Sequence, residues 1–362
     1  MVKNFSNAEL ISALYRALLR RDSDEAGMAH YAALLSGGAF SVADMIKSLM
    51  DSPEYEQIHG IPSLNAGQAA FRNPVSKNAG VYQTIDAVIF GDLDPGYMQA
   101  ANCVGSDFFA PAFRQFCDSI RHHVALHRKL WEFAFVVHHL AKKGSLREGA
   151  RGVVFGVGTE PLPSLFASLG CEVLATDAPV GVAAPGWSLT NQHSQSREQL
   201  FRKDIVASDV FEARVRFACA DMNAIDDSIR DFDFCWSSCC FEHLGDIEKG
   251  LDFVEASVEK TLKSGGVACH TSELNLSSND ETIASGDTVL FRRKDIERLI
   301  SRLERRGHYC EPLPFNSGSS FIDHLVDAPE GGGDIHIKLR LGSYVTTSFG
   351  IVVVKGGLGR LD

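Results

Sequence analysis

The sequence lacks the features that mark secreted, membrane-spanning and nucleic-acid-binding proteins. Its N-terminus has no cationic start followed by an unbroken apolar run, and no later stretch reaches the ~20 apolar residues that span a bilayer. Its nine cysteines include no C-x-x-C pair, which indicates reduced thiols. A formal net charge of −11 argues against a broad grip on nucleic acid, because that grip needs clustered lysine and arginine. We therefore expect a cytoplasmic protein with no membrane span, and we do not expect nucleic acid as a partner.

Length and periodicity predict two domains. With 362 residues, 45% of them hydrophobic, the chain can fill one large core and a smaller second one. Residues 1–60 carry apolar positions at helical spacing, which predict three short helices and a separate small all-α module. Residues 61–107 are rich in turn formers and predict a linker and irregular connection. Residues 108–362 remain for the larger domain.

From Gly152 onward, strand-like apolar runs alternate with helical ones. The runs include VVFG, EVLATD, VRFACAD, FDFCWSS and GVACHTSE. Such alternation predicts an α/β domain with a parallel sheet covered by helices. Between two of these runs, Asp246–Leu262 has apolar residues on one helical face, before Gly265 and Gly266 stop the helix.

Small or acidic side chains end three of the predicted strands. The first strand runs into Gly156 and Gly158, where the missing side chains let a ligand approach the backbone. Asp177 ends the next strand about 20 residues later, where a carboxylate can accept hydrogen bonds from both ribose hydroxyls. Asp221 and Met222 end the third and suit the amino group and the ring of adenine. Because ligands of such sheets bind at the carboxyl ends of the strands, these residues predict one adenosine site.

The dinucleotide fingerprint G-x-G-x-x-G is incomplete in this chain. Pro161 stands where the third glycine would meet a pyrophosphate, with Glu160 beside it. A carboxylate there repels phosphates and favours a cationic sulfonium or ammonium group. The sequence therefore disfavours a nicotinamide cofactor and hydride transfer.

The segment VVFGVGTEPLPSLFASLGCEVLATD resembles motif I and the acidic end of strand two in class I S-adenosylmethionine-dependent methyltransferases. Residues 233–266 resemble the strand-four segment of that family, and the resemblance covers about residues 110–356. It implies a Rossmann-like class I methyltransferase sheet. It also implies that S-adenosylmethionine is held by Gly156, Gly158, Asp177, Asp221 and Met222, with Ser237 and Ser238 near its methionine part. We add Thr159 and Glu160 of the same loop to the expected cofactor-binding residues.

Two positions depart from that family's pattern. The acidic residue usual in strand one is replaced by Val154, and the third glycine of the usual loop is Glu160. We therefore expect Glu160 to supply the missing carboxylate.

The N-terminal string LYRALLRRDSDEAGMAHYAALLSGG, closing with DSPEY, resembles a bacterial domain of unknown function related to the phycobilisome linker repeat. The resemblance covers about residues 5–58. It implies attachment or assembly, and hence a protein partner for the module, rather than chemistry.

Polar side chains gather after the predicted fourth and fifth strands. Methyl transfer to a hydroxyl needs a positioned acceptor and help in removing its proton. Glu242 and His243 follow strand four, while His270 and Glu273 end strand five. We expect His243, His270 and Glu273 to be catalytic residues on the acceptor side. The alternative is that Glu242 and His243 only cap the following helix.

The same side chains suit a divalent ion that would acidify a hydroxyl. Carboxylate and imidazole ligands fit Mg²⁺, Mn²⁺ or Zn²⁺, and the expected ligands are Glu242, His243 and His270. Small-RNA 2′-O-methyltransferases and ubiquinone-pathway O-methyltransferases carry E-x-x-E-H at this segment. This chain has Cys239 at the first of these positions, so Glu273 or His270 would have to replace the missing carboxylate.

Two further pairs are weaker candidates. Trp131 and Glu132 lie on a predicted helix and either line an edge of the cofactor site or pack in the core. Gln192 and His193 either cover the adenosine or meet the acceptor.

Together these features predict an O-methyltransferase that acts on a hydroxyl of a sugar or glycan terminus in bacterial surface-polysaccharide biosynthesis. The sugar rests on association, since the module and this methyltransferase type resemble parts of bacterial surface-polysaccharide enzymes. One alternative is an RNA 3′-end 2′-O-methyltransferase, which the acidic charge disfavours. The other is a scaffold that binds the cofactor without turnover.

Overall fold

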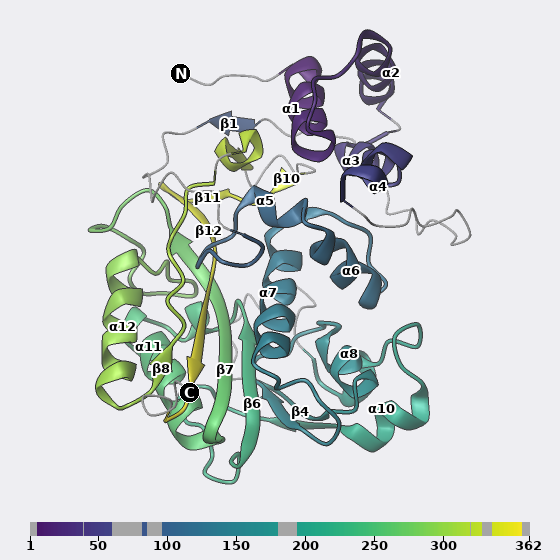
Figure 1. Cartoon of the computed structure of the whole chain (residues 1–362). Coiled ribbons are helices and arrows are strands. Elements are labelled where there is room, and N and C mark those ends of the chain that lie inside the picture. The colour runs from purple at the N-terminus through teal and green to yellow at the C-terminus, as the bar shows by residue number, and fades with distance from the viewer. Residues whose placement is uncertain are drawn as a thin grey trace. The chain divides into compact units, whose positions relative to one another are not determined.

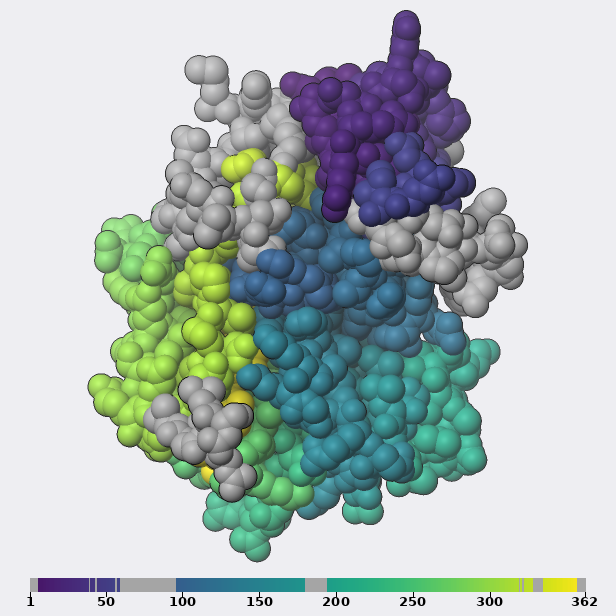
Figure 2. All heavy atoms as spheres, in the orientation of Figure 1, coloured from purple at the N-terminus to yellow at the C-terminus, as the bar shows by residue number. Residues whose placement is uncertain are grey.

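The computed structural model describes residues 6–38, 40–59, 82–84, 96–179, 194–318, 320–327 and 335–356, which are coloured in Figures 1 and 2. The chain forms two compact units. The first comprises residues 1–118, 122–131 and 315–345, and the second comprises residues 119–121, 132–314 and 346–362. The division differs from the expected boundary at residue 108, because residues up to 118 and residues 315–345 belong to the first unit.

The N-terminal part of the first unit is helical, as expected. Its described helices are α1 (Asn7–Leu19), α2 (Glu25–Ser36), α3 (Val42–Met50) and α4 (Pro53–His59). Ser6 and Ser41 cap α1 and α3 with capping boxes that satisfy the first backbone N–H groups. There is one helix more than predicted, because a proline is tolerated in the first turn and Pro53 begins α4 instead of only ending α3.

The helices α3 and α4 pack on the next part of the same unit, which contains α5 (Gly105–Phe108) and α6 (Pro111–Ser119). The buried Arg114 of α6 donates to the carbonyl oxygen of Met50 at 2.7 Å and pairs with Asp51. The hydroxyl of Tyr55 donates to the carbonyl oxygen of Phe109 at 3.1 Å. Short strands complete this unit: β1 (Tyr82–Thr84), β9 (Leu325–Asp327) and β11 (Leu339–Leu341) in one sheet, and β2 (Leu126–His127) beside β10 (Ile335–His336), with a turn η4 (Phe321–His324).

The second unit is built on a sheet in the order β5–β4–β3–β6–β7–β12, with β8 beside β12. The strands β3 to β7 run parallel, and β12 is antiparallel to β7. Their bounds are β3 (Arg151–Val154), β4 (Glu172–Asp177), β5 (Val215–Cys219), β6 (Phe232–Ser238), β7 (Leu262–Asn275), β8 (Tyr309–Cys310) and β12 (Tyr344–Val354), of which residues from 346 on belong to this unit. The expected α/β sheet is confirmed.

Helices cover both faces of this sheet (Figure 1). They are α7 (Arg128–Lys142, in this unit from residue 132), α8 (Leu162–Ser168), α10 (Ser208–Arg214), α11 (Ile247–Ala256) and α12 (Arg293–Arg305), with turns η1 (Arg197–Leu200), η2 (Phe241–His243) and the π-helical η3 (Ser257–Thr261). Side chains alternate along a strand. On β6, Trp236 packs on Phe166 of α8, whereas Cys235 faces Ser257 at the end of α11.

The sheet order fixes where a ligand can bind. The chain moves outward from β3 to β4 and β5, then returns to the other side of β3 with β6 and β7. In such sheets the crevice at the carboxyl ends of the strands on either side of the reversal is the binding site. Among the described residues, no helix is long and apolar enough to cross a membrane.

Candidate cofactor and acceptor site

The loop after β3 keeps its backbone open through two glycines in the left-handed region. Gly156 has a φ of 62° and Gly158 a φ of 51°, which side-chain-bearing residues adopt at a cost. A Cβ added to Gly156 would lie 2.9 Å from the Sγ of Cys240 and 3.6 Å from the Sδ of Met222. The loop therefore lies directly against the residues that follow β6 and β5.

Asp177 ties the end of β4 to this loop. Its Oδ2 accepts from the backbone N–H of Gly158 at 3.1 Å and from that of Ser194 at 3.0 Å, and its Oδ1 accepts from Ala178 N–H at 2.9 Å. Ser194 also donates from its hydroxyl to the carbonyl oxygen of Gly158. The structure thus brings together the glycine loop and the carboxylate predicted to hold a ribose. The two hydrogen bonds of Ser194 were not predicted, since no local sequence pattern around that serine indicates them.

The end of β5 lies beside Asp177, as the resemblance implies. The N–H of Ala220 donates to the carbonyl oxygen of Asp177 at 2.9 Å. Asp221 and Met222 follow directly, both half-buried, and Oδ1 of Asp221 accepts from the N–H of Asn223 at 2.9 Å. Gly156, Gly158, Asp177, Asp221 and Met222 therefore gather at the carboxyl ends of three adjacent strands.

Thr159 and Glu160 continue the loop with different surroundings. Thr159 is exposed, and its carbonyl oxygen accepts from Arg202 at 2.6 Å. Glu160 is buried, and its Oε1 accepts from the indole N–H of Trp236 at 2.6 Å. This bond holds Glu160 against β6. Its expected contact with the methionine part of the cofactor stays a prediction.

His270 lies outside the group of acceptor-side residues that the sequence predicted. Its Nδ1 is 2.8 Å from Ser237 Oγ and its Nε2 is 2.9 Å from Ser257 Oγ. Because Ser257 donates to the carbonyl oxygen of Val254, it accepts from Nε2–H, and Ser237 donates to Nδ1. Complete burial lowers the pKa of His270 to about 3, so the ring is neutral at physiological pH. With both nitrogens engaged, His270 fits neither a metal ligand nor a general base, and we assign it a structural role.

The same contacts change the interpretation of the two serines at the end of β6. The hydroxyl of Ser237 faces His270 and is fully buried, so its expected place near the methionine part of the cofactor does not fit this geometry. Ser238 is also buried, one position closer to the carboxyl end of the strand. Its contact with the cofactor stays a prediction.

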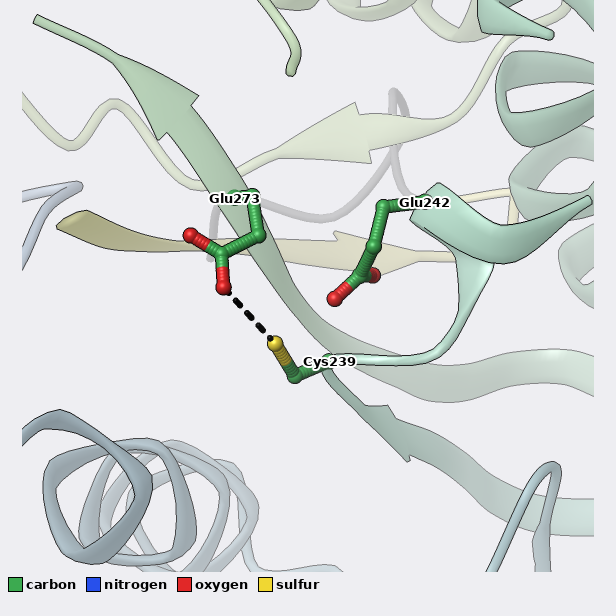
Figure 3. A group of neighbouring side chains, drawn as sticks. All are labelled: Cys239, Glu242 and Glu273. Atoms are coloured by element: carbon green, nitrogen blue, oxygen red, sulfur yellow. Dashed lines mark hydrogen bonds between the residues drawn. The ribbon is translucent and has the colours of Figure 1, made fainter. Parts of the chain in front are cut away.

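Three other side chains converge at the carboxyl ends of β6 and β7. Cys239 follows β6, Glu242 lies on η2 and Glu273 lies on β7, and one donor atom from each lies within 4.8 Å of the others (Figure 3). The Sγ of Cys239 donates to Oε1 of Glu273 at 3.5 Å, and Oε2 of Glu273 accepts from Thr346 Oγ1 at 2.8 Å. All three are buried. Cys239, which stands where the E-x-x-E-H motif has its first carboxylate, is part of this cluster.

Glu242 is fully buried, and among the described residues only one of its carboxylate oxygens has a hydrogen-bond partner. Oε2 accepts from Ser272 Oγ at 2.7 Å. Oε1 lies 3.6 Å from Nε2 of His243. A buried carboxylate oxygen without a partner costs about 1–3 kcal/mol or more, which points to a ligand at this position.

His243 is oriented by backbone and side-chain contacts on its far side. Its Nδ1 donates to the carbonyl oxygen of Asp287 at 2.6 Å, and Thr288 Oγ1 lies 3.1 Å from the same nitrogen. A carbonyl only accepts, so Nδ1 carries the proton and Nε2 is the basic nitrogen of the neutral ring.

The helix α11 is capped by Asp246, which accepts from the N–H of Lys249 at 2.9 Å. The alternative that Glu242 and His243 cap this helix is therefore wrong.

Two of the weaker candidates, Trp131 and Glu132, are held by buried hydrogen bonds. Trp131 is fully buried and donates to Asp107 at 2.7 Å, which is core packing. Glu132 is fully buried and accepts from Ser348 at 2.6 Å and Thr271 at 3.2 Å. Gln192 and His193 lie outside the described residues.

Comparison with known proteins adds two findings. Residues 1–58 match a family model described as a domain of unknown function, DUF4214. That match supports the N-terminal resemblance but does not show the relation to the phycobilisome linker repeat. No curated protein matches the sequence.

Several solved structures resemble the chain at low identity. One is the methyltransferase domain of bacterial-CtHen1-CN, with 16% identity, 60% of this chain and 95% of that chain covered, and a TM-score of 0.38. Another is an S-adenosylmethionine-dependent methyltransferase from Clostridium acetobutylicum, with 14% identity, 68% and 98% covered, and a TM-score of 0.35. A third is magnesium protoporphyrin IX methyltransferase from Synechocystis with bound SAM, with 12% identity, 74% and 87% covered, and a TM-score of 0.36.

The sheet of the second unit itself fixes the fold. Five parallel strands in the order β5–β4–β3–β6–β7, followed by the antiparallel β12, form a mixed sheet with helices on both faces. The second unit has the class I methyltransferase fold.

Proposed function

We propose that this protein transfers a methyl group from S-adenosylmethionine to a hydroxyl of a sugar or glycan terminus in bacterial surface-polysaccharide biosynthesis, in the cytoplasm. The observation that carries the proposal is the contact between the two halves of the site. The cofactor loop at Gly156 touches Cys240, which stands between Cys239 and Glu242 of the acceptor side. Residues expected to hold an adenosine and residues suited to activate a hydroxyl therefore lie side by side.

The residues present fit the cofactor. A Cβ at Gly156 would lie only 2.9 Å from the Sγ of Cys240, so the glycine lets the loop pack against the residues after β6 and β5, and Asp177 accepts from the N–H of Gly158 in the same loop. S-adenosylmethionine, when bound, supplies a methyl group on a sulfonium, which the acceptor oxygen takes in an in-line displacement. Asp177 and Asp221 offer acceptors for its ribose and adenine.

The proton of the acceptor hydroxyl goes to His243. Its basic Nε2 faces Glu242, and its Nδ1–H is held by Asp287. When Nε2 takes the proton, the buried carboxylate 3.6 Å away stabilises the imidazolium. A divalent ion, Mg²⁺, Mn²⁺ or Zn²⁺, would instead lower the pKa of the hydroxyl. A chelator distinguishes the two mechanisms, because it abolishes activity only where the ion is needed.

The choice of a sugar rests on the resemblance of the module and methyltransferase type to parts of surface-polysaccharide enzymes. The N-terminal module would dock on a protein partner of that assembly. The alternatives are methylation of an RNA 3′ end, which the net charge of −11 disfavours, and a scaffold without turnover, which the polar acceptor side disfavours.

The test is a screen of methyl transfer from radiolabelled S-adenosylmethionine onto nucleotide sugars, oligosaccharides and RNA 3′ ends. We expect label on a sugar hydroxyl. Label on RNA alone would replace the sugar with the RNA alternative. Cofactor binding without transfer to any acceptor would support the scaffold.

A further inference from the structure

We propose that Cys239, Glu242 and Glu273 bind a zinc ion as its three protein ligands. The position of this site on the acceptor side rests on the proposed function, whereas the ability to bind zinc does not. The evidence is geometric and comes from three elements of the second unit: the end of β6, the turn η2 and the strand β7.

The donor atoms of three side chains gather at one place. One atom each from Cys239, Glu242 and Glu273 lies within 4.8 Å of the others. Zinc lies about 2.0–2.3 Å from its ligand atoms, so two ligand atoms of one tetrahedron are roughly 3–4 Å apart. The Sγ of Cys239 lies 3.5 Å from Oε1 of Glu273 and already has this spacing. Figure 3 shows the Glu242 carboxylate turned toward the other two side chains.

The state of Glu242 provides an independent argument. It is 0% exposed, and Oε1 has no hydrogen-bond partner among the described residues. Burying a carboxylate oxygen in this way is costly unless a cation or a donor completes its coordination. Ser272 holds the other oxygen at 2.7 Å and fixes the carboxylate in this orientation.

His243 lies beside this ligand set and is not part of it. Its Nδ1–H donates to the carbonyl oxygen of Asp287 at 2.6 Å, and its Nε2 lies 3.6 Å from Oε1 of Glu242. Its Nε2 therefore stays available as the proton acceptor of the proposed function.

The thiol of Cys239 selects the ion. Magnesium prefers oxygen ligands in octahedral geometry, whereas a thiolate favours zinc. One thiolate and two carboxylates offer three donors, and a tetrahedral zinc with three protein ligands keeps its fourth position for water or substrate. On binding, the S–H bond of Cys239 breaks, its proton leaves to solvent, and the sulfur lone pair that remains binds the ion. No oxidant or reductant takes part.

The experiment is a titration of the metal-free full-length protein with Zn²⁺ and, separately, with Mg²⁺, followed by calorimetry. Cobalt(II) replaces zinc in a parallel sample, because a thiolate bound to cobalt gives a charge-transfer absorption that oxygen ligands do not. We expect one zinc per chain, weak binding of magnesium and a cobalt–thiolate band.

Two cysteine variants form a matched pair. Cys239 and Cys240 are adjacent and equally exposed, at 7%, but Sγ of Cys240 donates to the carbonyl oxygen of Phe155 at 3.3 Å. Cys239→Ser should weaken zinc binding by about 100-fold or more and remove the cobalt–thiolate band, while Cys240→Ser should change neither. Cys239→Asp should retain an ion site but shift its preference from zinc toward magnesium and manganese.

Zinc affinity unchanged in Cys239→Ser, or absent from the folded wild type, would overturn the proposal. Should Cys239→Ser not fold, the isosteric Glu242→Gln provides the second test, and zinc affinity equal to wild type in that variant would also overturn it. S-adenosylmethionine binding is measured on the same metal-free samples. If that binding persists while zinc does not bind, the zinc site is wrong and the proposed methyltransferase stands.

Discussion

His270 and Glu242 are two equally buried ionisable groups of one unit, and the structure gives them opposite surroundings. Both are 0% exposed. His270 has a serine hydroxyl at each ring nitrogen, whereas Glu242 has a partner at one oxygen and none at the other among the described residues. A buried group whose polar atoms are all hydrogen-bonded fits a structural role, whereas a buried carboxylate with one unpaired oxygen is a candidate for binding a ligand. Burial alone does not distinguish these roles.

The largest effect we expect comes from His243→Ala. Loss of the proton acceptor, or of a metal ligand, should cut turnover by about 10²–10⁴-fold, while S-adenosylmethionine affinity stays within about twofold of wild type. Steady-state kinetics with the identified acceptor and calorimetry with the cofactor measure the two quantities. Normal turnover in a folded His243→Ala protein would show that another residue is the catalytic group and that the pair Glu242 and His243 has no functional role.

The structural role of His270 is tested by the pH dependence of the protein's stability. The folded-state pKa of His270 is about 3, below the ~6.5 of an unfolded histidine. Between these values the unfolded state holds the extra proton, so this residue makes the free energy of unfolding fall by about 1.4 kcal/mol for each pH unit below ~6.5. His270→Gln should remove that slope. Denaturant titrations from about pH 7 to pH 4 should show it, and parallel curves for wild type and variant would contradict the assignment.

The sequence predicted much of the fold and the cofactor side, because both depend on local pattern. EVLATD coincides with β4 and FDFCWSS with β6. The predicted helix Asp246–Leu262 is capped by Asp246, but its last turn is the π-helical η3. The positions of the glycines and aspartates at the strand ends could be predicted, because they follow from where each strand ends.

The acceptor side was only partly predictable. Spacing placed Glu242, His243 and Glu273 at strand ends, but it did not show which side chains turn toward one another. His270 lies three residues before Glu273 on β7 and faces Ser257, and Cys239 was noticed only as a departure from E-x-x-E-H. Ser272 donates to Glu242 and the carbonyl oxygen of Asp287 accepts from His243, and these orienting partners lie 30 and 44 residues away in the chain.

Arg114 of the first unit is a buried charged residue that has both an ion-pair partner and a hydrogen-bond partner. It pairs with Asp51 and donates to Met50 O, and its side chain is 7% exposed. Arg114→Met should lower the stability of the first unit by about 1–3 kcal/mol, because hydrogen bonds to a charged group are lost in a buried site. The exposed pair of Arg16 and Asp22 provides the control, and Arg16→Met should have a much smaller effect. Thermal unfolding measures both, and equal shifts would contradict the role of burial.

Two glycines distinguish the cost of backbone conformation from the cost of close contact at the cofactor loop. Gly156 and Gly265 both have positive φ, at 62° and 79°, but an added Cβ meets Cys240 at 2.9 Å in the first case and nothing within 4 Å in the second. Each change to alanine should cost about 1–2 kcal/mol for the backbone. Gly156→Ala should cost more and should alone weaken cofactor binding. Identical losses of stability, with unchanged cofactor affinity, would show that Gly156 has no special place in the site.

The central claim is that the second unit binds S-adenosylmethionine through the strand ends at Gly156, Asp177 and Asp221. Calorimetric titration of wild type and Asp177→Ala with S-adenosylmethionine, S-adenosylhomocysteine and NAD tests it most directly. We expect the first two ligands to bind and NAD not to bind, with affinity in Asp177→Ala weakened by about 1–3 kcal/mol through lost charge-assisted hydrogen bonds to the ribose. Equal affinity in the two proteins, or a preference for NAD, would contradict the claim.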